Sequence, residues 1–199
     1  MEKFNSLTGL VAPLRRSNVD TDQIIPAQFL TSVSKDGYGE NLFKIIRAQE
    51  PDLFINNPKY ANAEILLAAE NFGSGSSREH AVWAICGAGF KVVIAKSFAD
   101  IFRSNSAKNG LLLIELPSEV VDSMLDRAES EELKLSVNLA AQTVVDPLSG
   151  EHAFEYDSFR KHCLLQGLDD IDYIRSVSDE IETFRKAQEP YRFFDTTKA

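Results

Sequence analysis

The chain has 199 residues, of which 44% are hydrophobic and 26% are charged, and its formal net charge is −9 at pH 7. This composition is that of a globular protein with a full core, and the acidic balance argues against a nucleic-acid-binding protein. No apolar stretch is long enough to span a membrane, and the first residues lack the pattern of a signal peptide. Two cysteines, Cys86 and Cys163, are too few for a disulfide framework, so we expect buried free thiols and a cytoplasmic protein.

The first third of the chain predicts one strand and several irregular segments. Residues 7–13 alternate loosely and end at a proline, which is typical of a strand. Residues 19–25 predict an extended acidic turn, residues 29–38 a loop, and residues 41–49 a short helix.

The middle of the chain alternates apolar runs with helix-like segments. Ser97 and Ser118 are expected as the N-caps of the second and third of these helices. Strands joined by short helices predict a βαβ core with at least some parallel pairing. The expected strands are 65–69, 91–95 and 111–116, and the expected helices are 78–88, 98–105 and 118–128.

The last third predicts short strands followed by helices. The strands are expected at 134–138, 142–145 and 152–156, and the helices at 158–166, closed by Gly167, and at 171–188, interrupted near Ser178. No internal repeat or linker divides the chain. We therefore expect a single domain over 1–199, with a core at about 4–165 and a C-terminal helical extension at about 166–194.

The most informative stretch is a glycine-serine loop between the expected strand 65–69 and the expected helix 78–88. Glycines let the backbone approach a ligand, and the first N–H groups of a helix attract an anion. Two serine hydroxyls and the planar fork of Arg78 suit a carboxylate better than a phosphate. The structural alternative is that Ser76 or Ser77 only caps the helix.

Three segments together resemble the aconitase family. The octapeptide Gly-Ser-Gly-Ser-Ser-Arg-Glu-His at 73–80 is similar to the family's Gly-Ser-Ser-Arg-Glu-His motif. Residues 18–26 resemble its first active-site loop, and residues 95–106 resemble its third block. In order and spacing the three are similar to those of the small subunits of bacterial 3-isopropylmalate dehydratases, over about residues 4–194.

This resemblance implies an α/β fold, the swivelling β/β/α domain of the aconitase type, with a mixed sheet flanked by helices and with C-terminal helices. It implies a hydro-lyase that isomerises 2-isopropylmalate and 3-isopropylmalate, through dehydration and rehydration in leucine biosynthesis, and that is active only with its large subunit. The expected partners are that iron–sulfur subunit and a small dicarboxylate. The expected cofactor is a [4Fe–4S] cluster carried by the large subunit, because two cysteines cannot supply its thiolates.

The resemblance also assigns catalytic roles. Ser76 would be the base that takes and returns the carbon-bound proton, and Asp22 would pair with a histidine of the other subunit. From the residues alone, Asp20 and Asp22 would point the same way from an extended loop, or would only cap a turn or face solvent. Ser77 and Arg78 match the positions that hold a substrate carboxylate, although Arg78 could instead form a surface ion pair with Glu79 or another acid.

The remaining expected site residues bind the substrate or support the site. Thr21 is a candidate hydroxyl donor, and Lys35 is a candidate cation for a substrate carboxylate, although such a loop lysine often only faces solvent. Glu79 and His80 are expected to support the site, as are Gly73 and Gly75, and no residue is expected to bind a metal. An apolar patch for an isopropyl group, or an anchor for the loop, is expected from Phe29, Leu30 and Val33.

Other interpretations stay open at this point. The chain could belong to a related hydro-lyase acting on citraconate, methylmalate or homoaconitate, which shares these motifs. It could be a stand-alone anion-binding module, although it has no Gly-Lys-Ser/Thr phosphate loop and no Gly-x-Gly-x-x-Gly fingerprint. A serine hydrolase is disfavoured because Gly-x-Ser-x-Gly is absent. The exact substrate, the stoichiometry and the role of the C-terminal helix do not follow from the sequence.

Overall fold

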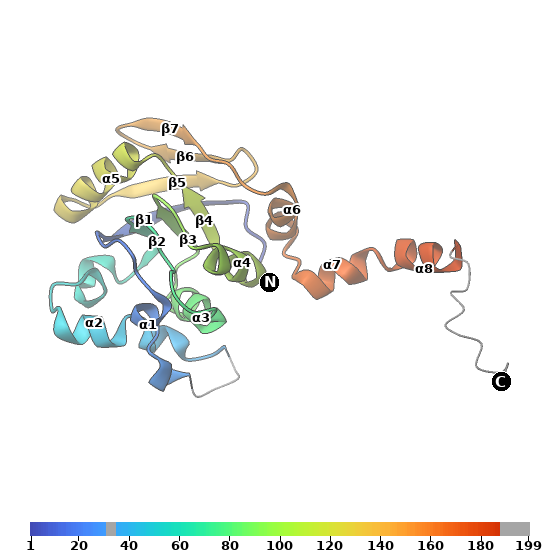
Figure 1. Cartoon of the computed structure of the whole chain (residues 1–199). Coiled ribbons are helices and arrows are strands. Elements are labelled where there is room, and N and C mark those ends of the chain that lie inside the picture. The colour runs from blue at the N-terminus through green and yellow to red at the C-terminus, as the bar shows by residue number, and fades with distance from the viewer. Residues whose placement is uncertain (31–34, 188–199) are drawn as a thin grey trace.

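The computed structural model describes residues 1–30 and 35–187 (Figure 1). Within these residues, seven strands form one sheet in the order β4-β3-β2-β1-β5-β6-β7. Strands β1 to β4 are parallel to one another, and β5 to β7 continue the sheet in antiparallel fashion from β1. The strands are β1 (Ser6–Leu14), β2 (Ala63–Ala68), β3 (Val92–Ala95), β4 (Leu112–Glu115), β5 (Lys134–Asn138), β6 (Thr143–Asp146) and β7 (Gly150–Ala153).

The parallel strands β2, β3 and β4 are almost entirely buried on both faces, which explains their continuous apolar sequences. In β2, Leu66 belongs to one core, whereas its neighbours Ile65 and Leu67 belong to the other. All of β3 is buried. In contrast, the antiparallel strand β5 alternates, with Leu135 and Val137 buried.

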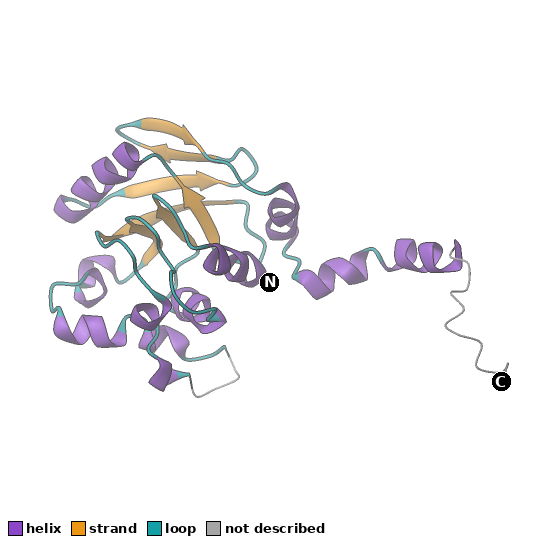
Figure 2. Ribbon diagram, in the orientation of Figure 1, coloured by secondary structure: helices purple, strands orange, loops and turns teal. Residues whose placement is uncertain are grey.

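Helices cover both faces of this sheet (Figure 2). The core on one face takes in side chains of α1, α2, α3 and α4, and the core on the other face takes in α5 and α6. Helix α5 is amphipathic, because its buried side chains Val121, Met124, Leu125 and Ala128 recur at helical spacing. The helices are α1 (Thr21–Ile24), α2 (Lys44–Gln49), α3 (Glu79–Gly87), α4 (Asp100–Asn109), α5 (Ser118–Ser130), α6 (Ser158–Gln166), α7 (Asp170–Ser176) and α8 (Ser178–Ala187).

Four short 3₁₀ helices complete the described structure, and one of them packs directly on the end of α3. They are η1 (Ala27–Phe29), η2 (Tyr38–Asn41), η3 (Phe54–Asn56) and η4 (Pro58–Tyr60). A Cβ atom placed on Gly39 of η2 would lie 2.2 Å from the carbonyl carbon of Gly87. The two backbones therefore touch at a point where neither can carry a side chain.

The C-terminal helices leave the body of the molecule. Helix α6 ends at Gly167, which adopts the left-handed conformation (φ 73°) expected of a glycine C-cap. Helices α7 and α8 then run away from the sheet (Figure 1), and neither contains a buried residue. The expected interruption near Ser178 is confirmed, because α7 ends at Ser176 and α8 begins at Ser178.

Several expected boundaries were wrong. The segment predicted as an extended turn contains helix α1. Helix α4 begins at Asp100, with Ala99 as N-cap and no side-chain cap, while the Ser97 hydroxyl accepts a hydrogen bond from the Asn71 backbone N–H (2.8 Å). Ser118 is already helical in α5, because Pro117 takes the N-cap position.

Candidate active site

Three loops meet at the carboxyl ends of the parallel strands, which is where open α/β sheets bind ligands. A parallel bridge joins Asp20, after β1, to Ser74, after β2. A second parallel bridge joins Phe72, after β2, to Phe98, after β3. The three family-like segments, 18–26, 73–80 and 95–106, therefore lie side by side at one edge of the sheet.

Backbone hydrogen bonds hold the first two loops together. The N–H groups of Gly73 (2.8 Å) and Ser74 (3.1 Å) donate to the Val19 carbonyl, and the Thr21 N–H donates to the Ser74 carbonyl (2.9 Å). The Thr21 hydroxyl, in a residue only 2% exposed, donates to the Ser76 carbonyl (3.2 Å). Thr21 therefore lies at the site, but its hydroxyl holds the serine loop.

The glycines of the loop have distinct reasons to be glycine. Gly73 and Gly75 both adopt positive φ angles, of 78° and 89°, which L side chains rarely adopt. A Cβ atom on Gly73 would also lie 2.2 Å from the Phe102 ring, whereas a Cβ on Gly75 would lie 3.5 Å from its nearest neighbours. Gly73 thus lets α4 pack against the loop, and Gly75 provides only the turn.

The serines are exposed at the end of this loop. Helix α3 begins at Glu79, and its N-cap is Arg78, which makes no side-chain cap hydrogen bond. The alternative in which Ser76 or Ser77 caps the helix is therefore wrong. Both serines are exposed, and among the described residues no partner holds either hydroxyl. The hydroxyls are thus available to a ligand.

The two carboxylates of the first loop, those of Asp20 and Asp22, bind different partners. Asp20 caps α1, where its side chain accepts from the Gln23 N–H (2.7 Å) and Gln23 reciprocates (3.3 Å) in a capping box. Asp22, in the first turn of α1, forms an ion pair with the guanidinium of Arg78. Of the alternatives for these carboxylates, the cap is confirmed for Asp20, because the chain turns into a helix at Thr21 and does not continue as an extended loop.

The Arg78–Asp22 pair is half open to solvent. The Arg78 side chain is 19% exposed and that of Asp22 is 57% exposed. An exposed ion pair contributes little to stability, about 0–1 kcal/mol. Asp22 can therefore orient the arginine fork without preventing a ligand carboxylate from replacing it.

Lys35 reaches the same helix from another loop. Its ammonium donates to the Asn109 side chain (2.8 Å) and lies 5.6 Å from the centre of the Trp83 ring. Glu79 accepts a hydrogen bond from the Asn109 amide (2.7 Å), and His80 packs against Trp83, with ring centroids 4.6 Å apart. Lys35, Glu79 and His80 thus lie around the first turns of α3.

Sequence reasoning missed Asn109 and Trp83, which connect these residues. The indole N–H of Trp83 donates to the same Asn109 oxygen (2.9 Å). The four-residue spacing of Glu79 and Trp83 places both on one face of α3, and this was the available signal. Asn109, at the end of α4, gave no local signal because its partners are distant in sequence.

The expected apolar patch is described only in part. Phe29 and Leu30 are half-buried and pack against the core, as expected of residues that anchor the loop. Val33 lies outside the described residues.

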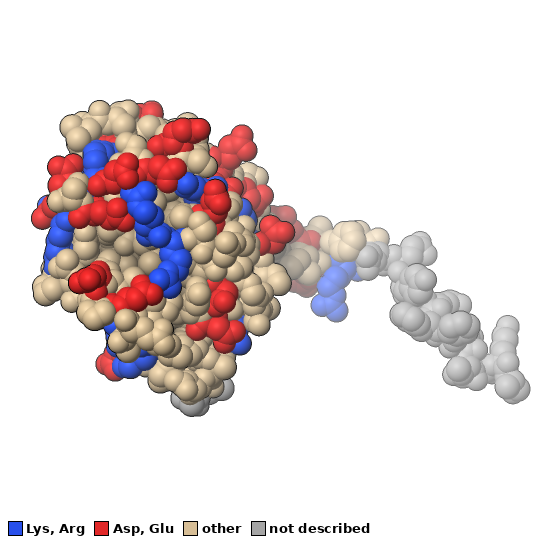
Figure 3. All heavy atoms as spheres, turned by 60° about the vertical axis from the view of Figure 1, so that its left-hand side comes forward, with Lys and Arg blue, Asp and Glu red and all other residues tan. Residues whose placement is uncertain are grey.

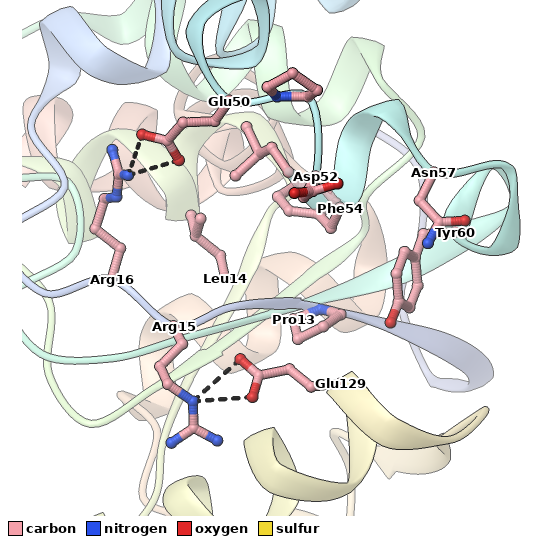
Figure 4. Close-up of a pocket in the computed structure, with 12 residues that line it drawn as sticks. Pro13, Leu14, Arg15, Arg16, Glu50, Asp52, Phe54, Asn57, Tyr60 and Glu129 are labelled. Carbon is pink, nitrogen blue, oxygen red and sulfur yellow. Dashed lines mark hydrogen bonds and ion pairs between the residues drawn. The ribbon is translucent and has the colours of Figure 1, made fainter.

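A hollow lies elsewhere in the described structure and involves none of the expected site residues. It has a volume of about 520 Å³ and is lined in part by Arg15 and Arg16, which follow β1 (Figure 4). Arg15 pairs with Glu129 (3.0 Å) and Arg16 with Glu50 (2.6 Å), so acids already neutralise both cations. Basic and acidic side chains are similarly intermixed over the face drawn in Figure 3.

The described residues do not suit an iron–sulfur cluster or another metal site. No group of three His, Cys, Asp or Glu side chains among them could hold a metal ion. Burial raises the pKa of Cys86 to about 11, so this cysteine is a thiol at neutral pH. Cys163 is buried as expected, whereas Cys86 is only half-buried, and two cysteines so far apart in sequence do not make up the set of thiolates that a cluster requires. Within the described residues, no helix has the length and apolarity needed to cross a membrane.

Comparison with known proteins agrees with this geometry. Residues 1–119 match the model of the aconitase C-terminal domain. A crystal structure of 3-isopropylmalate dehydratase from Methanocaldococcus jannaschii has the same fold, with a TM-score of 0.67, 24% identity, and coverage of 90% of this chain and 99% of that one. The fold and the loop edge therefore define an aconitase-type domain, as the sequence predicted.

Relatives of higher identity narrow the class. The 3-isopropylmalate dehydratase small subunit of Francisella philomiragia is 50% identical over 189 residues, which are 94% of this chain and 99% of the relative. That of Paramagnetospirillum magneticum is 50% identical over 200 residues, covering 96% of this chain and 100% of the relative. The chain belongs to the family of 3-isopropylmalate dehydratase small subunits.

Proposed function

We propose that this chain is the small subunit of a two-chain hydro-lyase that interconverts 2-isopropylmalate and 3-isopropylmalate in leucine biosynthesis. The observation that carries the proposal is the exposed Ser76-Ser77-Arg78 edge, with both hydroxyls available, in a chain 50% identical to such subunits. The reaction removes a proton from a carbon next to a carboxylate and hydroxide from the neighbouring carbon. Rehydration then returns both groups with their positions exchanged.

Arg78 and Ser77 would bind a carboxylate of the substrate. The guanidinium fork matches a carboxylate in two places, and the N-terminus of the nine-residue helix α3 adds its partial positive charge. Binding would exchange one carboxylate, that of Asp22, for another on Arg78. Asp22 would then be free to turn toward a histidine of the partner subunit.

Ser76 would act as the base. An unassisted serine is a very poor base, so its alkoxide requires stabilisation by loop N–H groups, by the N-terminus of α3 and by nearby cations. The Ser76 alkoxide would take the carbon-bound proton during dehydration and return it during rehydration. The hydrogen bond from Thr21 to the Ser76 carbonyl would fix this serine, which is otherwise exposed, at one place in the loop.

The departing hydroxide requires a Lewis acid that the residues of this chain do not provide. A [4Fe–4S] cluster in the large subunit would supply this acid, because the two thiols of this chain are unsuited to it. We therefore propose that the large iron–sulfur subunit covers the exposed serine edge and completes a shared active site. We also propose that the complex works in the cytoplasm, where free thiols persist.

The test is anaerobic dehydration of 3-isopropylmalate by the purified chain, alone and mixed with the large subunit. Activity only in the mixture is the expected result. Ser76→Ala should then lower turnover by about 10²–10⁴-fold with assembly intact. Ser123→Ala, at an exposed position of α5 away from the serine loop, is the matched control and should be unchanged.

Near-normal turnover by Ser76→Ala would contradict the assignment of the base. An intact, cluster-loaded complex that does not dehydrate 3-isopropylmalate but dehydrates methylmalate or homocitrate-type substrates would contradict the proposed substrate. Binding of such anions by the isolated chain, without turnover in the mixture, would favour an anion-binding module.

A further inference from the structure

The side chain of Asn109 joins three segments, which are the loop of Lys35, helix α3 and helix α4. Its oxygen accepts hydrogen bonds from the Lys35 ammonium (2.8 Å) and the Trp83 indole N–H (2.9 Å). Its NH₂ group donates to the Glu79 carboxylate (2.7 Å) and to the Asn105 carbonyl (2.9 Å). Two acceptor and two donor positions of the amide are therefore used, which is its full capacity.

The chemistry of this position requires an amide. An aspartate would attract Lys35 but could not donate to Glu79, and its charge would repel that carboxylate. A leucine would fill a similar volume and lose every bond. A hydroxyl has one proton and could not make both donor bonds, whereas an amide can accept twice and donate twice, so Asn109 holds Lys35 and Glu79 together.

Holding these two groups bears directly on the carboxylate site. A lysine side chain has many rotamers, so an ammonium that is fixed by Asn109 and lies 5.6 Å from the Trp83 ring centre is ordered before any substrate arrives. Glu79 directly follows Arg78, and its bond to Asn109 turns its carboxylate toward α4. Arg78 pairs with Asp22 instead.

We propose that Asn109 is a positioning residue for substrate binding: it fixes the Lys35 ammonium beside the first turns of α3, where Lys35 meets a substrate carboxylate, and it restrains Glu79 from competing for Arg78. This inference rests on the proposed function of the serine edge. It assigns Lys35 to the binding of a substrate carboxylate, and it assigns Asn109 to the positioning of Lys35.

If Asn109 only tied α4 to α3, its substitution would lower stability without a specific effect on substrate binding. Asn56 provides the matched control, because its amide also makes two donor hydrogen bonds, in this case to the backbone carbonyls of Arg47 (2.7 Å) and Glu50 (3.1 Å). Asn56 belongs to η3 and contacts none of the site residues. Asn56→Ala therefore measures the loss of a comparable structural asparagine.

The experiment is a double-mutant cycle on the assembled complex with 3-isopropylmalate. Lys35→Ala should raise KM about tenfold with kcat nearly unchanged, as expected for the loss of uniform substrate binding. Asn109→Ala should raise KM by about five- to tenfold, and the double variant should exceed Lys35→Ala only by the smaller effect of releasing Glu79, because Asn109 acts mainly through Lys35. Asn56→Ala should leave KM unchanged.

Two results would overturn the proposal. One is an unchanged KM in Asn109→Ala, and the other is a double variant in which the two KM effects multiply to about a hundredfold, as independent sites require. Asn109→Asp provides a further check: it keeps the bond to Lys35 but repels Glu79. It should therefore retain part of the KM effect, and a KM equal to that of the unaltered complex would contradict the restraint on Glu79.

A second readout separates failure of this inference from failure of the proposed function. Trp83 is the single tryptophan of the chain, so its fluorescence reports on the network in the full chain without substrate or partner. Asn109→Ala should shift the Trp83 emission and increase its quenching by acrylamide, while Asn56→Ala should do neither. Unchanged emission and quenching in Asn109→Ala would refute the network even if the complex converts isopropylmalate, and a clear change would support it even if the substrate is another malate.

Discussion

Alanine substitutions at Gly73 and Gly75 separate two causes of glycine in one loop. Both positions have positive φ, 78° and 89°, so either alanine is strained by about 1–2 kcal/mol. The two positions differ in the room that is available for a Cβ atom. A Cβ on Gly73 would lie 2.2 Å from the Phe102 ring, whereas a Cβ on Gly75 has ordinary contacts from 3.5 Å outward. The comparison therefore isolates the packing of α4 on the serine loop.

The additional effect at Gly73 follows from the surroundings of Phe102. Carbon atoms in contact normally lie about 3.5–4.0 Å apart, so the ring or the loop must move by more than about 1 Å. Phe102 is 1% exposed and packs edge-on against Phe72, with centroids 5.4 Å apart. Overpacking in such a core costs about 1–3 kcal/mol, so we expect Gly73→Ala to be less stable than Gly75→Ala by that amount.

Urea unfolding of both variants measures this difference directly, and thermal unfolding should show Tm values about 2–4 °C apart for each kcal/mol. Phe102→Ala should cost less stability in the Gly73→Ala background than in the native background, because it removes the Cγ and Cδ1 atoms that meet the new methyl group. Equal destabilisation of the two glycine variants, or an equal cost of Phe102→Ala in the native and the Gly73→Ala backgrounds, would refute the packing argument.

Two further predictions concern other described contacts. Thr21→Val keeps the buried shape but removes the hydrogen bond to the Ser76 carbonyl, so stability should fall by about 1 kcal/mol and kcat of the complex about tenfold; an unchanged kcat would contradict a positioning role. Burial opposes ionisation of Asp146. Hydrogen bonds from the Arg127 guanidinium, the Ser149 hydroxyl and the Leu148 backbone N–H outweigh this effect and lower the pKa of Asp146 from 3.8 to about 2. Because the folded state has the lower pKa, this stabilisation, about 2 kcal/mol, is complete above about pH 4 and is lost as the pH falls toward 2. Urea unfolding at pH 5 and pH 3 should show a larger loss in the native chain than in Asp146→Asn, and an equal loss in both would refute this contribution of Asp146.

The alternating core of the fold could be predicted because its signals are local. The buried strands β2, β3 and β4 are short apolar runs, and each lies close to the expected residues. Helix α1 was missed although its capping box was present, because Asp20 and Gln23 were interpreted as part of an acidic turn. The start of α4 gave no such signal, because its N-cap, Ala99, has no side chain that can cap.

The candidate site likewise has one part that could be predicted from local sequence and one part that could not. The serine loop was predictable because glycine, serine and arginine are adjacent in sequence and their chemistry is clear from residue type alone. The Asn109 network was not, because Lys35 lies 74 residues and Trp83 lies 26 residues from Asn109 in sequence. The roles of Ser76 and Asp22 stay predictions until the variants are assayed.

The contact between Gly39 and Gly87 restricts how this chain could acquire a new substrate. The backbone of η2 rests on the last residue of α3 so closely that a side chain at either position would force the two segments apart. A chimera that imports the segment around η2 from a relative must therefore keep both glycines. A loop graft is then tolerated at this joint only if the incoming segment places a glycine opposite Gly87.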